Sequence, residues 1–231
     1  MSSIAIITAR GGSKRIPRKN IKNFLRKPMI AYAIEAAKQS KIFDTVMVST
    51  EDKEISEVAK QYGAEVPFMR SAKNADDFAS TFDVIDEVIS EYKKQNKYFD
   101  TLCCIYPCVP FLKSNTLKLA YEKMRDFDAV VPVCKYPIPI EWAMSIKEGV
   151  LVPNNRDAQN IRSQDLEPKY FDVGMFYFCK TEKMYENNSL VADKTAAYII
   201  DGMECQDIDT IEDWELAELK YKILQDKCRA K

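Results

Sequence analysis

The chain has 231 residues, of which 46% are hydrophobic and 30% charged, a composition typical of folded globular proteins that excludes collagen-like and disordered chains. Lys and Arg number 34 against 35 for Asp and Glu, so the formal charge of -1 creates no general attraction for nucleic acid or an anionic membrane. No apolar run approaches the ~20 residues that span a bilayer, and the apolar stretch at residues 4–9 is too short for a secretory signal. We therefore expect one cytoplasmic domain, residues 1–231, with neither a nucleic-acid nor a membrane partner.

Histidine is absent, which excludes the chemistries that use it as general base, zinc ligand or triad member. The seven cysteines are odd in number and include no C-x-x-C pair, which argues against a disulfide framework or a thiolate zinc site. Cys103, Cys104 and Cys108 lie in or beside an apolar run. We interpret them as packing residues rather than as nucleophiles or redox groups.

Strand and helix patterns alternate along the first 134 residues. Continuous apolar runs predict strands at residues 4–7, 46–48, 64–69, 101–106 and 129–134. Apolar residues at helical spacing predict helices at residues 30–37, 52–62, 84–92 and 117–124. Strands that are apolar throughout are typical of a parallel sheet covered by helices on both faces, so we expect an α/β fold.

The pattern changes after Lys135. Residues 144–146 and 150–152 flank Glu148-Gly149, which predicts a β-hairpin, and prolines interrupt the neighbouring sequence. The chain then returns to the main pattern with two strands and a final helix, at residues 176–178, 197–200 and 211–224. We interpret the hairpin region as an excursion from the main sheet.

The strongest local signal is the basic segment that follows the first predicted strand. Between Arg10 and Lys27 there are eight basic residues and no acidic one. Gly11 and Gly12 allow backbone N–H groups to approach an anion, and open α/β sheets bind ligands at the carboxyl ends of their strands. The segment is neither a Walker loop nor a G-x-G-x-x-G dinucleotide loop. We interpret it as a polyphosphate site, the alternative being a solvated basic loop.

A second signal is the acidic stretch at residues 204–218, which holds seven carboxylates and no basic residue. Asp207 and Asp209 flank Ile208, so an extended segment would place both carboxylates on one side, where they could share Mg²⁺. The alternative is that Asp209 or Thr210 caps the last helix, whose first turn is acidic. The residues alone favour capping, and the two roles can coexist.

A basic loop for phosphates and an acidic pair for magnesium together suggest nucleotidyl transfer. Over almost its whole length, the chain resembles the CMP-sialic acid synthetases, the acylneuraminate cytidylyltransferases. The matching motifs are Ala9-Arg10-Gly11-Gly12-Ser13-Lys14, Ile16-Pro17, Lys19-Asn20, Val48-Ser49-Thr50, Arg70, Tyr106-Pro107 with Pro110, Arg162-Ser163-Gln164, Gly174 and Asp207-Ile208-Asp209-Thr210. Within the family, residues 104–107, 160–166 and 170–172 are most similar to those of bacterial pseudaminic acid cytidylyltransferases.

The resemblance implies a nucleotide-diphospho-sugar transferase fold of Rossmann-like type, with a mostly parallel sheet flanked by helices. It also implies a small dimerisation extension at residues 137–170, hence a homodimer, with CTP and a nonulosonic acid as substrates and Mg²⁺ as cofactor. The residues implied to bind the nucleotide are Arg10, Gly11, Gly12, Ser13, Lys14, Lys19, Asn20 and Arg70. Those implied to bind the sugar acid are Tyr106, Arg162, Gln164 and Asp172, and the implied metal ligands are Asp207 and Asp209.

The implied reaction is in-line attack of the anomeric hydroxyl of the sugar acid on the α-phosphorus of CTP, with release of pyrophosphate. Its catalytic candidates are Lys14, Arg10 and Asp209. The guanidinium of Arg162 suits the sugar carboxylate, the alternative being a surface ion pair with Asp165. Asp172 lies beside apolar strand residues, where an unpaired buried carboxylate would be costly, and this favours a functional role.

Three alternatives stay open. The sugar could be N-acetylneuraminic acid, legionaminic acid or the eight-carbon ulosonic acid of lipopolysaccharide. The chain could be a non-catalytic CTP-binding module, although a sensor does not need a metal positioned for transfer. It could be a glycosyltransferase of related fold, whose Asp-x-Asp would more often lie mid-chain than before the last helix.

The family implies that the product serves glycosylation of flagellin or a surface polysaccharide.

Overall fold

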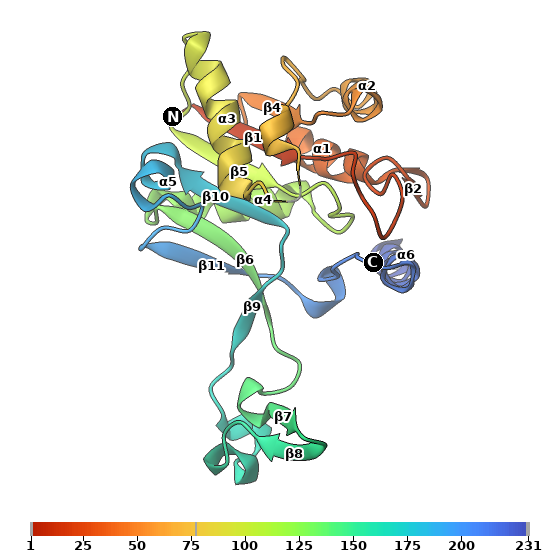
Figure 1. The fold of residues 1–231 in the computed structure, drawn as a ribbon, viewed down its shortest axis with the longest axis vertical. Helices are drawn as coiled ribbons and strands as arrows, with labels where there is room; N and C mark the ends of the chain where they lie inside the picture. The colour runs from red at the N-terminus through yellow and green to blue at the C-terminus, as the bar shows by residue number, and fades with distance from the viewer. Residues whose placement is uncertain (1, 77, 230–231) are drawn as a thin grey trace.

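The computed structural model describes residues 2–76 and 78–229. Its centre is a seven-stranded sheet of order β11-β6-β10-β5-β1-β4, with β9 also paired to β6 (Figure 1). The strands are β1 (Ser3–Thr8), β4 (Thr45–Ser49), β5 (Thr101–Ile105), β6 (Ala129–Lys135), β9 (Tyr170–Asp172), β10 (Phe176–Lys180) and β11 (Thr195–Ile199). Parallel pairs join β4 to β1, β1 to β5 and β6 to β11, while β10 lies antiparallel between β5 and β6. The predicted mostly parallel sheet is confirmed.

Helices cover both faces of this sheet. They are α1 (Met29–Ser40), α2 (Lys53–Gln61), α3 (Thr81–Lys94), α4 (Ser114–Glu122), α5 (Thr181–Asn187) and α6 (Ile211–Arg229). Ile4 and Ile6 of β1 pack in one apolar cluster with α3 and α5, whereas Ala5 and Ile7 pack in another with α1, α2 and α4. All four side chains are fully buried, which explains why the strand is apolar throughout rather than alternating.

The predicted strand at residues 64–69 is wrong. In that segment the structure has a single bridge, between Glu65 and Met47, after which the chain leaves the edge of the sheet. Pro67 has no N–H to continue a ladder, and the backbone rejoins β4 only where the Arg70 N–H donates to the carbonyl of Thr50 at 2.9 Å. The pairing is therefore too short to form a strand.

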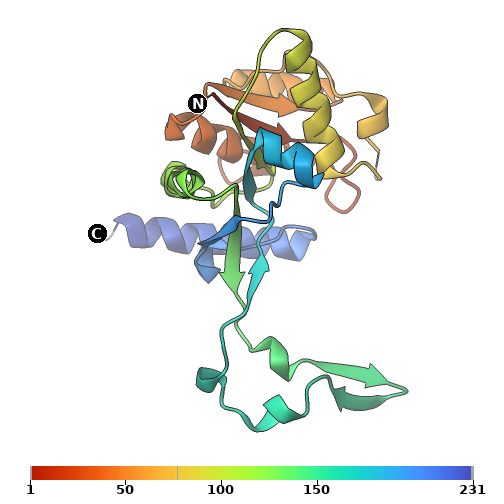
Figure 2. The same ribbon diagram turned by 90° about the vertical axis from the view of Figure 1, so that its left-hand side faces the viewer.

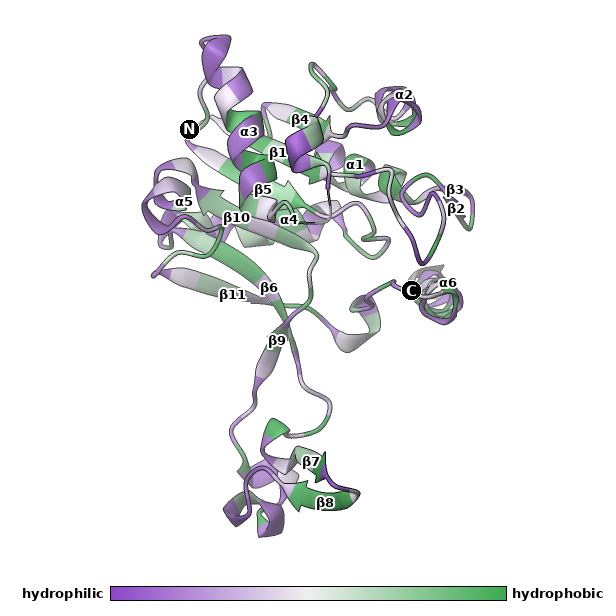
Figure 3. Cartoon of the chain, in the orientation of Figure 1, coloured by the Kyte–Doolittle hydropathy of each residue, from purple (hydrophilic) through white to green (hydrophobic). Residues whose placement is uncertain are grey.

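A segment between β6 and β9, residues 136–169, projects away from the sheet and its helices and is called the extension below (Figures 1 and 2). It carries the predicted hairpin, β7 (Met144–Lys147) and β8 (Val150–Pro153). Glu148 and Gly149 form the two-residue turn of this hairpin. Their φ angles of 50° and 82° are both positive, as a type I′ turn requires. Figure 3 shows this hairpin to be largely hydrophobic, although it lies outside the main core.

The last helix, α6, closes the end of the molecule that carries the basic loop. Trp214 and Ala217 of α6 pack in a third apolar cluster that also contains Ile16 and Ile208. A short ribbon, β2 (Asn23–Phe24) and β3 (Lys27–Pro28), contributes Phe24 to the same cluster. Because Ile16 and Ile208 belong to the same cluster, the acidic segment around residue 208 packs against the basic loop around residue 16. Among the described residues, no helix combines the length and the apolar character needed to cross a bilayer.

Candidate active site

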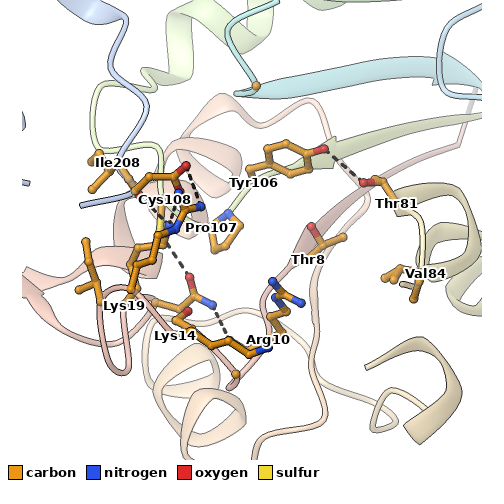
Figure 4. Close-up of a pocket in the computed structure, with 18 of the residues that line it drawn as sticks. Thr8, Arg10, Lys14, Lys19, Thr81, Val84, Tyr106, Pro107, Cys108 and Ile208 are labelled. Atoms are coloured by element: carbon orange, nitrogen blue, oxygen red, sulfur yellow. Dashed lines mark hydrogen bonds and ion pairs between the residues drawn. The ribbon is translucent and has the colours of Figure 1, made fainter. Parts of the chain in front are cut away.

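A cleft of about 660 Å³ lies where β1 and β5 end, as expected for ligands of open α/β sheets. Ten of the residues proposed from sequence line it, namely Arg10, Gly12, Ser13, Lys14, Lys19, Asn20, Arg70, Tyr106, Asp207 and Asp209. Figure 4 shows Lys14 and Lys19 on one side of the cleft and Tyr106 with Thr81 on the other. The structure thus brings the basic loop and the acidic pair, which are nearly 200 residues apart, into one site.

Asn20 anchors the start of the basic loop. It is 4% exposed, and its Nδ2 donates to the carbonyl oxygen of Arg10 at 2.8 Å. The thiol of Cys108 lies 3.3 Å from Asn20 Oδ1. Burial raises the pKa of Cys108 to about 12, so the thiol stays protonated near neutral pH and is a weak nucleophile. This agrees with the interpretation of Cys108, together with the fully buried Cys103 and Cys104, as packing residues.

The two glycines of the loop play different roles. The N–H of Gly11 donates to Glu51 Oε1 at 2.6 Å, and Gly11 does not line the cleft. A Cβ at Gly11 would lie 2.5 Å from Asp52 Oδ2, so a side chain cannot be placed there without displacing Asp52. Gly12 lines the cleft, and a Cβ there would meet no atom within 4 Å. In this structure the N–H of Gly11 is therefore directed to Glu51 and not into the cleft, whereas Gly12 lines the cleft.

The basic loop is less unbalanced in charge than its sequence suggests, because carboxylates from other segments reach it. Arg18 pairs with Asp52, which precedes α2, and with Glu54 in the first turn of that helix. The hydrogen bond from Arg18 holds the pKa of Asp52 below its ordinary value of 3.8. Lys27 pairs with Glu35. Arg10 and Lys14 line the cleft itself, where their charges suit a polyanion.

Arg70 forms part of the cleft wall and is held rigidly. It is 8% exposed, and its Nη2 and Nε donate to the carbonyl and hydroxyl oxygens of Ser49 at 2.6 and 3.0 Å. Burial lowers the pKa of the guanidinium, and the nearby carboxylate of Glu51 opposes that shift. A guanidinium fixed in this way presents a constant surface to a ligand.

The acidic pair has the predicted alternation. Ile208 is 1% exposed and packs inward, while Asp207 and Asp209 both line the cleft. Asp209 lies 2.8 Å from Arg15 Nη2 and 3.5 Å from Lys19 Nζ.

Thr210 and Asp213 cap the start of α6. Thr210 Oγ1 accepts from the N–H of Asp213 at 3.2 Å, and Asp213 Oδ2 accepts from the N–H of Thr210 at 2.8 Å. Of the two proposed caps, Thr210 is confirmed and Asp209 is wrong, because the reciprocal pair satisfies the helix start and leaves the Asp209 side chain at the cleft.

The donor set of the cleft suits magnesium shared with a substrate. Among residues 2–76 and 78–229, no group of three or more Cys, Asp or Glu side chains is arranged to hold a metal by itself. Mg²⁺ is usually bound by one or two carboxylates together with water and substrate phosphates. Asp207 and Asp209 provide two such carboxylates at a cleft that also presents cations for a polyphosphate.

The wall opposite the basic loop includes the aromatic side chain of Tyr106. The hydroxyl of Tyr106 lies 3.2 Å from Thr81 Oγ1, and its ring packs edge-on against Tyr177 with centroids 5.6 Å apart. Burial raises the pKa of Tyr106, which therefore keeps its proton. A second cavity of about 640 Å³ adjoins the cleft, shares Tyr106 and Thr81 with it, and is also lined by Leu190 and Val191.

The residues at the start of α3 were missed in the sequence. Ser80 and Thr81 line both cavities. Ser80 and Asp83 form a capping box, with Ser80 Oγ accepting from the Asp83 N–H at 3.2 Å and Asp83 Oδ2 accepting from the Ser80 N–H at 3.0 Å. The S-x-x-D spacing before an apolar helix was the signal that could have located this helix start at the site.

Three of the proposed sugar-binding residues lie outside the cleft of their own chain. Arg162 and Gln164 are in the extension and exposed, and Arg162 Nε lies 2.7 Å from Asp165, which is the surface ion pair considered as its alternative. Asp172 is exposed rather than buried. Its strand, β9, pairs only with the C-terminal end of β6, at Val133–Lys135. Its carboxylate accepts from the hydroxyl of Tyr177 at 2.9 and 3.0 Å and from the N–H of Gly174 at 2.8 Å.

Comparison with known proteins agrees with this geometry. The family described as Cytidylyltransferase matches residues 4–199. The chain is 40% identical to the pseudaminic acid cytidylyltransferase of Campylobacter jejuni, covering 96% of this chain and 97% of that protein. It is 33% identical to the CMP-N,N'-diacetyllegionaminic acid synthase of Legionella pneumophila, covering 98% and 99%.

Among solved structures, CMP:2-keto-3-deoxy-manno-octonic acid synthetase complexed with CTP shares the fold, with a TM-score of 0.67, 16% identity, and coverage of 98% of this chain and 100% of that one. The predicted nucleotidyltransferase fold is thereby confirmed. The chain belongs to the cytidylyltransferase family.

Proposed function

We propose that the protein is a CMP-nonulosonic acid synthetase that converts CTP and pseudaminic acid to CMP-pseudaminic acid and pyrophosphate. The observation that carries this proposal is the convergence of Arg10 and Lys14 with Asp207 and Asp209 on one cleft. The 40% identity to the Campylobacter jejuni enzyme supports pseudaminic acid over the other nonulosonic acids.

Binding of CTP would rest on charge neutralisation and positioning. Arg10 and Lys14 face the triphosphate and stabilise the negative charge that passes to pyrophosphate when the sugar hydroxyl attacks. Asp207 and Asp209 would hold Mg²⁺, which supplies further charge neutralisation on the phosphates when bound. Arg15 and Lys19 orient the Asp209 carboxylate.

The attacking hydroxyl must lose its proton during the reaction. The chain contains no histidine, so the acceptor would be a carboxylate of the cleft, the triphosphate itself or a base supplied by the metal. Asp209 is our candidate because it lies in the cleft beside the cations that would surround the phosphates. No covalent enzyme intermediate is required.

The sugar acid would bind on the side of Tyr106, where Tyr106 and Thr81 provide hydroxyls and the adjoining cavity provides apolar surface. Arg162 and Gln164 project with the extension away from the cleft of their own chain, so they could serve a sugar site only on a second copy. We therefore propose a homodimer in which the extension of each copy contributes to the site of the other.

Exposed apolar side chains of the extension support this dimer. Ile146, Val150 and Leu151 of the hairpin are 76%, 62% and 61% exposed. An isolated two-stranded hairpin is marginally stable in water and needs an apolar partner. We expect dimers in light scattering of the native protein and monomers for the Ile146→Asp/Leu151→Asp double variant. Monomeric native protein at working concentration would contradict the dimer.

The direct test measures pyrophosphate release with Mg²⁺ and CTP, comparing pseudaminic acid, N-acetylneuraminic acid and no sugar. Release with pseudaminic acid alone is the expected result. Release with N-acetylneuraminic acid instead would keep the reaction and overturn the sugar assignment. Protein that binds CTP but releases no pyrophosphate with any nonulosonic acid would favour the non-catalytic CTP-binding alternative.

A further inference from the structure

The turn after β4 places two consecutive carboxylates behind the basic loop. Glu51 accepts the N–H of Gly11 at 2.6 Å, near the start of the loop. Asp52 pairs with Arg18 further along the loop and also caps α2 by accepting the N–H of Ile55 at 3.0 Å. Neighbouring residues of one turn therefore hold the loop at two points.

Glu51 also reaches the buried Arg70. Glu51 Oε2 lies 4.0 Å from Arg70 Nη1, and the Arg70 side chain is only 4% exposed. Within the part of the chain that the structure describes, this oxygen is buried and accepts no hydrogen bond. The carboxylate thus lies between a backbone N–H of the basic loop and the guanidinium in the cleft wall, and it contacts both regions of the proposed CTP site without lining the cleft.

The loop lies close against this turn. A Cβ at Gly11 would come within 2.5 Å of Asp52 Oδ2, so a larger residue at this position would displace the Asp52 side chain. A carboxylate directly behind an anion-binding loop opposes phosphate binding by its charge. The presence of Glu51 there is explained if holding the loop in place improves phosphate binding by more than the negative charge weakens it.

We propose that Glu51 is a positioning residue for CTP, holding the loop that carries Arg10 and Lys14 in fixed relation to Arg70. This inference rests on the proposed function only in taking CTP as the ligand. Glu51 positions the loop by accepting the hydrogen bond of the Gly11 N–H. Its essential property is therefore a side chain long enough to place an acceptor oxygen at that N–H, and its charge is secondary.

Three substitutions separate reach from charge. Glu51→Gln keeps an acceptor of the same length and removes the charge. Glu51→Asp keeps the charge but is shorter by one carbon–carbon bond, about 1.5 Å. Glu51→Ala removes both. Glu57→Ala, an exposed carboxylate of α2, is the matched control. CTP affinity is measured by calorimetry without sugar, KM is measured for each substrate, and the melting temperature is recorded for every variant.

We expect Glu51→Ala and Glu51→Asp to weaken CTP binding about tenfold, the effect of losing one hydrogen bond. Glu51→Gln and Glu57→Ala should stay within about threefold of the native affinity. The KM for the sugar acid should not change in any variant that melts normally, which distinguishes positioning from general damage to the fold.

Native CTP affinity in Glu51→Ala would overturn the inference, as would equal losses in Glu51→Gln and Glu51→Ala. If Glu51→Ala does not fold, the contrast between Glu51→Asp and Glu51→Gln decides, and a native-like Glu51→Asp with a defective Glu51→Gln would show that charge, not reach, matters. Failure of the native protein to bind CTP would instead remove the proposed function, so the two failures are distinguishable.

Discussion

The ammonium of Lys19 donates a hydrogen bond to the backbone carbonyl of Ile208 at 2.6 Å and lies 3.5 Å from the carboxylate of Asp209. One side chain of the basic loop thus holds the acidic segment that enters α6. The two most strongly charged segments of the chain stabilise each other's position at the cleft, and neither would form the site alone.

Removal of this side chain should separate the two segments. Lys19→Ala should lower kcat/KM for CTP by about a hundredfold, since small misplacements of reacting groups cost rates of that order. Lys22→Ala is the control, because Lys22 lies over the ring of Trp214 at 4.9 Å and does not line the cleft. Steady-state pyrophosphate release measures both, and equal activities of the two variants would contradict the role given to Lys19.

The acidic pair and the loop lysine should be needed for turnover rather than for folding. Asp209→Ala and Lys14→Ala should each lower kcat by about a hundredfold or more, as removal of groups that stabilise transition-state charge does. Asp213→Ala should behave oppositely, losing stability with its helix cap while retaining turnover. Thermal melts beside the pyrophosphate assay separate the effects. A folded, fully active Asp209→Ala protein would remove its metal role.

Magnesium should be required for activity. Chelation by EDTA should abolish pyrophosphate release, and added Mg²⁺ should restore it, because two carboxylates suffice only for a metal that also binds substrate phosphates. The apparent Mg²⁺ affinity should rise with CTP concentration for the same reason. Full activity in EDTA would exclude a metal at Asp207 and Asp209.

The pair of Arg18 and Asp52 should contribute stability that depends on pH. The folded protein holds the pKa of Asp52 below its ordinary value of 3.8, so the contribution is present above that value and is lost as the pH falls through the folded-state pKa. Asp52→Asn keeps an acceptor for the helix cap but removes the charge. It should lower the free energy of unfolding by about 1 kcal/mol at neutral pH.

Urea titrations of Asp52→Asn and native protein should therefore converge at acidic pH. A difference that persists unchanged well below pH 3.8 would mean that the charge of Asp52 is not what stabilises the turn.

Tyr106 should affect the sugar acid rather than the nucleotide. Tyr106→Phe removes the hydroxyl that lies 3.2 Å from Thr81 Oγ1 but keeps the ring packed on Tyr177. We expect the KM for the sugar acid to rise about tenfold, the effect of one lost hydrogen bond, with unchanged CTP affinity. Calorimetry with CTP is the control measurement. A selective loss of CTP affinity would place Tyr106 on the nucleotide side.

Much of the architecture was readable from local pattern. Apolar runs located β1, β4, β5 and β6, because strands buried on both faces must be apolar throughout. The Glu148-Gly149 turn located the hairpin, since it needs two positive φ values. Alternation around Ile208 correctly placed Asp207 and Asp209 on one side, because successive side chains of an extended segment point oppositely.

Tertiary structure alone decided the rest, because those features depend on which distant segments meet. The apolar run of β10 does not reveal that it lies antiparallel between two strands of the opposite direction. Glu51 reads as an ordinary acidic residue until folding places it at the Gly11 N–H. Arg162 and Gln164 match a motif, yet the fold directs the extension that carries them away from the cleft of their own chain. Sequence by itself determined the local conformations and the charges; the long-range packing determined which of those charges share a site.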